Sequence, residues 1–122
     1  MIVFGLLFSL TATASDAAQA AKAVEGSAKA DKLDACVAPT PFMRRNHFEL
    51  IKHQRDVTVH EGIRKTDNSL AGCIDCHAAK DAHGEHVAVD ADDQFCASCH
   101  AYTGVSFDCF SCHATKPTKT GN

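Results

Sequence analysis

Hydrophobic and polar residues divide the chain into an apolar start, an alanine-rich stretch, one periodic segment and a long segment without periodicity. Residues 1–14 are apolar and end in a small-residue pattern, which is typical of the hydrophobic region and cleavage site of a secretory signal. No Lys or Arg precedes this run. A helix of this length would span only about 21 Å, whereas the hydrocarbon slab is about 30 Å thick. We therefore expect either a cleaved signal or a short, uncleaved membrane anchor, with the main body exported.

The next segment, residues 15–35, is rich in alanine and carries scattered Asp, Lys and Glu. Alanine favours helix, but the sequence Glu25-Gly26-Ser27 interrupts the run. No stripe of bulky apolar residues is present. We predict a partly helical tether that spaces the rest of the chain from the membrane.

A periodic segment follows the alanine-rich stretch. Thr40 suits an N-cap and Pro41 suits the first helical position, so we predict a helix from Pro41 to about Asp56. The β-branched residues 57–59 weaken helix beyond that point. One face of this helix would carry Met43, His47, Leu50, Ile51 and Gln54 at helical spacing.

Composition shows what the remaining sequence lacks. From Leu33 to the end, only 18 of 90 residues are Val, Ile, Leu, Met or Phe, a proportion at which a chain struggles to order itself. The net charge of −3 is unlike the strongly positive charge that is typical of nucleic-acid-binding domains. Cysteine (7) and histidine (8) are unusually common. We expect something other than aliphatic side chains to fill the interior.

The cysteines fall into three Cys-x-x-Cys-His motifs within 41 residues, at 73–77, 96–100 and 109–113. In this motif both thiols add across the vinyl groups of one haem, and the histidine becomes the proximal iron ligand. We therefore predict three covalent haem c groups. The attachment residues would be Cys73, Cys76, Cys96, Cys99, Cys109 and Cys112, with His77, His100 and His113 as proximal ligands.

Other uses of paired cysteines fit less well. Structural zinc takes four ligands per site, commonly from two paired Cys-x-x-Cys units. Three such units, each followed by a histidine, do not match that arrangement. A disulfide framework suits an exported chain but leaves the histidine after each pair unexplained. A thioredoxin-like motif needs a βαβ context, which is absent. Since haem would supply the missing apolar volume, we expect the chain without haem not to fold stably.

Axial donors tune haem potential and reactivity, and several residues could supply the distal ligands. Met43 could instead pack in the core. Cys36 could instead be a free or buried thiol that binds no iron. His53 lies on a neighbouring face of the predicted helix, and His60 follows it by seven residues. The candidates along the chain are Cys36, Met43, His47, His53, His60, His83 and His86.

The stretch from Cys36 to Arg64, followed by three haem motifs, resembles the triheme cytochrome c subunits (DsrJ) of the transmembrane complex DsrMKJOP, which is linked to dissimilatory sulfite reductase. The likeness covers about residues 36–117. It implies His/His, His/Met and His/Cys ligation of the haems. The matching residues are Cys36 as thiolate, Met43 as the methionine candidate, and His47, His53 and His60 as the upstream histidines.

The resemblance also implies partners. These are membrane quinone-interacting subunits, a periplasmic iron–sulfur subunit and a cytoplasmic subunit related to heterodisulfide reductase. The basic segment 44–65 and the acidic segment 67–108 could form docking faces, although solvated surface is the simpler interpretation.

Together these observations predict a mostly α fold with extensive irregular loops, organised around three haems. Residues 1–14 would be signal or anchor, 15–35 a tether and 36–122 the triheme domain. We expect a periplasmic cytochrome, anchored by or exported through the N-terminal segment, that transfers electrons within a membrane complex of sulfur metabolism. The alternatives are a haem enzyme acting on a small sulfur compound at the Cys36-linked haem, and a free soluble electron shuttle. No catalytic residue is predicted.

Overall fold

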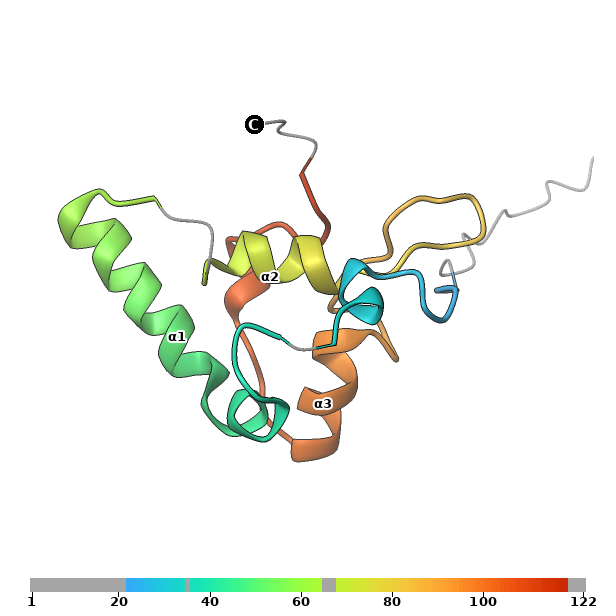
Figure 1. Cartoon of the computed structure of the whole chain (residues 1–122), viewed down its shortest axis with the longest axis horizontal. Coiled ribbons are helices and arrows are strands. Elements are labelled where there is room, and N and C mark those ends of the chain that lie inside the picture. Colours follow the sequence, from blue (N-terminus) through green and yellow to red (C-terminus); the bar gives the residue numbers. More distant parts are fainter. Residues whose placement is uncertain (1–21, 35, 65–67, 119–122) are drawn as a thin grey trace, which may run out of the picture.

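The computed structural model describes residues 22–34, 36–64 and 68–118. Within these ranges the elements follow in the order η1 (Lys29–Lys32), α1 (Thr40–Glu61), α2 (Leu70–His77), α3 (Phe95–Thr103) and η2 (Cys109–Ser111), where η is a 3-10 helix (Figure 1). Isolated β-bridges also occur, between Ala23 and Asp81 and between Lys80 and His86. The predicted fold, mostly α with long irregular loops, is confirmed.

Most of the predictions for the N-terminal part of the chain concern residues outside the described ranges. The apolar segment 1–14 and the start of the alanine-rich segment, 15–21, lie outside the described residues. In the part of the chain that the structure describes, no helix is long and apolar enough to cross a membrane.

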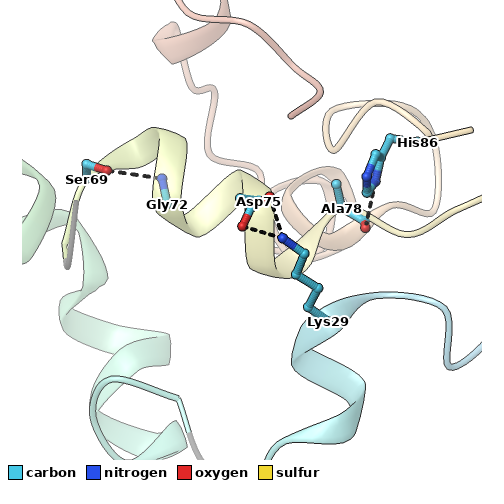
Figure 2. Close-up of polar contacts among 6 residues, drawn as sticks. All are labelled: Lys29, Ser69, Gly72, Asp75, Ala78 and His86. Atoms are coloured by element: carbon cyan, nitrogen blue, oxygen red, sulfur yellow. Dashed lines mark hydrogen bonds and ion pairs between the residues drawn. The ribbon is translucent and has the colours of Figure 1, made fainter. Parts of the chain in front are cut away.

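The described end of the alanine-rich segment, residues 22–34, lies against the loop that follows α2. Ser27 Oγ accepts the Lys80 backbone N–H at 2.7 Å and donates to the Lys80 carbonyl at 3.1 Å. In η1, Lys29 Nζ forms a 2.6 Å ion pair with Asp75 of α2 (Figure 2). This portion of the chain is therefore packed onto the body.

Helix α1 begins one residue earlier than the sequence suggests. The predicted N-cap, Thr40, is already helical, and Pro39 is the N-cap. The reason is that the Pro39 carbonyl accepts the backbone N–H groups of Phe42 at 2.9 Å and Met43 at 3.0 Å, so it opens the helical ladder in place of Thr40.

The end of α1 lies five residues beyond the predicted Asp56. The β-branched residues 57–59 stay helical, and Thr58 Oγ1 donates to the Ile63 carbonyl at 3.0 Å. Gly62 then ends the helix with a φ of 69°, a left-handed conformation that glycine adopts without steric cost. Local hydrogen bonds thus outweigh the modest helix preference lost at β-branched positions.

Each cysteine motif sits on its own short helix. The first motif occupies the last five residues of α2, the second lies within α3, and the third spans η2. Ser69 caps α2 by accepting the Gly72 N–H at 3.0 Å (Figure 2). The sequence did not predict α2 or α3, because eight or nine residues are too few to display an apolar period.

The core is small and lies where the motifs meet. Ile74, Ala78 and Val89 are buried together, and the partly buried Leu70, Cys96 and Phe110 pack against them. Helix α1 contributes no buried residue, and its C-terminal end diverges from α2 and α3 (Figure 1). The core therefore joins positions from all three motifs, while α1 stands to one side.

Candidate functional site

The first motif histidine faces the unpaired cysteine. His77 is the last residue of α2, and its Nε2 atom lies 4.0 Å from Cys36 Sγ. The two residues are 41 positions apart in sequence, so tertiary folding brings them together. Burial lowers the pKa of the His77 imidazole, and the nearby charge of Asp31 partly opposes this shift. The neutral imidazole is the form that ligates metals.

The second motif histidine faces α1. The rings of His47 and His100 have centroids 6.1 Å apart and planes at 84°. His47 Nδ1 lies 3.0 Å from the Met43 carbonyl, and His100 Nδ1 lies 3.1 Å from the Val105 carbonyl. A carbonyl at this position holds the proton on Nδ1 and leaves the Nε2 lone pair available for a metal.

The third motif is the most open of the three. The His113 backbone N–H donates to the Cys109 carbonyl at 3.0 Å, and Ser111 Oγ donates to the Asp108 carbonyl at 2.7 Å. The following segment is fixed where the Val89 N–H donates to the Thr115 carbonyl at 2.9 Å. This motif is therefore held by backbone bonds beside the core.

The motif thiols converge at the core. None of the seven cysteines, all of which lie in described ranges, forms a disulfide. Burial, together with the nearby Cys109 and Cys73 thiols, raises the pKa of Cys96 to about 11. Burial also raises the pKa of Cys73, with a contribution from Cys36. Cys96 thus lies near the first cysteine of each of the other two motifs.

The remaining candidate ligands are placed less closely. Met43 is half-buried on the same side of α1 as His47, whereas His53 and His60 are exposed. In the described ranges no hydrogen bond or ring contact joins His53 or His60 to a motif residue. His86 Nδ1 lies 3.3 Å from the Ala78 carbonyl, next to the first motif (Figure 2).

The spacing of the two donor pairs can be tested against a metal held between them. Metal–sulfur and metal–nitrogen bonds are about 2.3 and 2.0 Å, so two such donors to one metal would lie at most about 4.3 Å apart. The Cys36–His77 separation of 4.0 Å is close to this value. The ring centroids of His47 and His100 lie 6.1 Å apart, so the two imidazoles would be able to share one metal. Both pairs are therefore close enough that each would be able to hold the iron of a haem between its two donors.

Open space adjoins one histidine of the second pair. A hollow of ≈ 400 Å³ opens beside His100, with Ala97, Ala101, Val105 and Phe107 among its walls. In the described residues, these sites included, no cluster of three or more His, Cys, Asp or Glu side chains is arranged to hold a metal ion. The candidate donors described above lie in two pairs, Cys36 with His77 and His47 with His100.

Sequence reasoning missed two aromatic residues at these pairs. The ring of Phe95 stacks on His77 with centroids 3.8 Å apart. Phe107 meets His100 edge-on at 4.4 Å and also contacts Phe110. The pairing of Phe95 with His77 leaves no local signal, since it links α3 to α2. The position of Phe95 immediately before a haem motif was the one available hint.

Comparison with known proteins adds one relative. No protein-family profile matches the chain, and no solved structure is significantly similar to it. A protein of Archaeoglobus fulgidus named "Hdr-like menaquinol oxidoreductase cytochrome c subunit" is 25% identical over 92 residues. The match covers 66% of this chain and 56% of the relative, so the chain spans little more than half of the relative's length.

Proposed function

We propose that this chain is a periplasmic triheme c-type cytochrome that transfers electrons as a subunit of a membrane-bound, quinone-interacting complex of dissimilatory sulfur metabolism. The observation that carries the proposal is the approach of Cys36 Sγ to His77 Nε2, at a separation that one metal would bridge. A motif histidine opposite a second donor is what an axial pair requires.

The wider parts of the proposal rest on similarity. The relative's name, a cytochrome c subunit of a menaquinol oxidoreductase, supports partners that interact with quinone in the membrane. The resemblance of the Cys36–Arg64 stretch to DsrJ supports a sulfur-linked complex with a periplasmic iron–sulfur subunit. Attachment to the membrane, or export through it, would use residues 1–14.

A haem bound at each motif would supply a one-electron iron centre. The cysteine pairs of the motifs would hold the groups covalently. His77 and Cys36 would flank one metal, and His100 and His47 would flank a second. His113 would bind the third, with Met43, His53 or His60 as the proposed opposite donor. The proximity of Cys96 to Cys73 and to Cys109 would bring the attachment points together, which favours transfer between centres.

Haem counting tests the proposal directly. The intact mass of the mature full-length chain should exceed the polypeptide mass by three haems, and the pyridine haemochrome assay should give the same stoichiometry. Replacing both cysteines of one motif by alanine should remove one haem. A chain that carries no covalent haem, or that keeps three after such a replacement, would contradict the proposal.

Purification of the full chain from membranes tests the assembly. We expect membrane subunits and an iron–sulfur subunit to co-purify with it after mild detergent extraction. Recovery as a single soluble protein would favour the electron shuttle instead.

The exposure of Cys36 supports a second candidate, a haem enzyme that acts on a small sulfur compound. Cys36 is exposed to solvent, so a small molecule could approach the His77 site from that side. Sulfide, sulfite or cyanide should then perturb the spectrum of that haem in the ferric or ferrous state. If none of the three perturbs it, the enzyme hypothesis fails and electron transfer stands.

A further inference from the structure

Phe95 is an exposed aromatic residue with an unusual contact. It is the first residue of α3 and is 55% exposed. Its ring stacks on the imidazole of His77, with centroids 3.8 Å apart and planes at 16°. Phe95 does not belong to the buried cluster around Val89. The contact therefore lies outside the core.

The histidines of the two donor pairs are oriented in different ways. His47 and His100 each have a backbone carbonyl near Nδ1. Within the described ranges no such bond is found at His77 Nδ1, and its other nitrogen faces Cys36. The torsion that turns a histidine ring is broad and weakly restricted. Stacking on Phe95 is a contact across the face of the His77 ring, where it would resist rotation.

We propose that Phe95 is a positioning residue for His77, fixing the plane of the imidazole opposite the Cys36 thiol. The inference rests on the proposed function, because it treats His77 and Cys36 as axial ligands of one haem. Groups that orient a ligating histidine tune the metal as well as the ring. Here the orienting group is an aromatic face in place of a hydrogen-bond acceptor. It also connects the first motif to α3, which carries the second.

EPR of the ferric, haem-loaded full chain tests this role, because the g values of a low-spin haem depend on the orientation of its axial ligand planes. The signal of the His77 site is identified as the one lost in Cys36→Ala. In Phe95→Leu we expect this signal to broaden and its g values to shift, with a shift in the midpoint potential of the same haem. The signal of the His47–His100 site should stay unchanged. Phe95→Tyr, which keeps the ring, should restore the original signal.

Matched controls separate positioning from general packing. Tyr102→Leu changes another aromatic residue of α3, which is 92% exposed, and should leave all signals unchanged. Phe107→Leu removes the ring beside His100 and should affect only that site. Phe95→Met, which has similar volume and no ring, makes the same test if Phe95→Leu fails to load haem.

The outcomes distinguish this inference from the proposed function. If the unmodified chain carries no haem, the proposed function fails. If haem loading is normal and the Cys36-dependent signal is unchanged in both Phe95→Leu and Phe95→Met, the positioning role fails alone. Equal changes at all sites, or a Phe95→Tyr variant that behaves like Phe95→Leu, would also overturn it.

Discussion

The two donor pairs are supported differently by the fold. His77 ends α2, which buries Ile74 in the core and is tied to η1 by the Lys29–Asp75 ion pair. His47 lies on α1, which buries no residue, and meets α3 through His100. Packing therefore positions the histidine of the first pair. In the second pair, shared ligation of one metal would itself hold α1 against the rest of the chain.

Removal of all covalent haem should have the largest effect. With all six motif cysteines replaced by alanine, we expect most of the far-UV helical signal to disappear, because the proposed haems would supply the apolar volume of the interior. Any protection left in hydrogen exchange should lie in α2 and not in α1. Equal protection of α1 and α2 would show that ligation does not hold α1.

Loss of the α1 ligand comes next. In His47→Ala we expect α1 to lose hydrogen-exchange protection and the haem of the second motif to change its axial signature. The EPR signal of the Cys36–His77 site should persist. Asn46→Ala, at the neighbouring half-buried position, is the matched control and should change neither. Protection of α1 that survives His47→Ala would mean that packing suffices.

Truncation in the core should destabilise the α2 side of the molecule. Ile74 is 5% exposed, and replacing a buried isoleucine by alanine costs about 2–5 kcal/mol. Ile51→Ala on α1, where the side chain is half-buried, should cost less. Denaturant unfolding of the haem-loaded variants measures both. A larger loss for Ile51→Ala would reverse the comparison.

The smallest effect is expected at the ion pair between η1 and α2. Both partners are about half exposed, and such surface pairs contribute at most about 1 kcal/mol. Lys29→Ala should therefore lower the free energy of unfolding only slightly, and high salt should reduce the difference between variant and unmodified chain. A loss as large as that of Ile74→Ala would show that η1 carries more of the packing than its exposure suggests.

Local features were predictable from sequence and long-range ones were not. The helix around His47 was visible because its apolar face repeats and Pro41 marks its start. Helices α2 and α3 were not predicted, since they are short and their residues serve the cysteine motifs. The sequence offered His47, His53 and His60 as similar candidates. Only the fold distinguishes them, by bringing His47 to His100 while His53 and His60 remain exposed.

The Cys36–His77 approach shows the same limit. An unpaired cysteine was conspicuous in the sequence, but its partner is 41 residues away. Neither spacing nor periodicity selects one motif histidine among three. The stack of Phe95 on His77 is equally invisible, since it depends on how α2 and α3 meet.

The bonds between residues 23–27 and the loop after α2 fix the orientation of the body relative to this N-terminal segment. Ala23 bridges to Asp81, and Ser27 bonds to Lys80 in both directions. The segment from Ala23 to Ser27 is thus fixed to the body beside the loop that follows α2. If the chain is attached to a membrane upstream of this junction, the junction would restrict rotation of the body relative to segment 23–27. Redox partners would then encounter one preferred side of the protein.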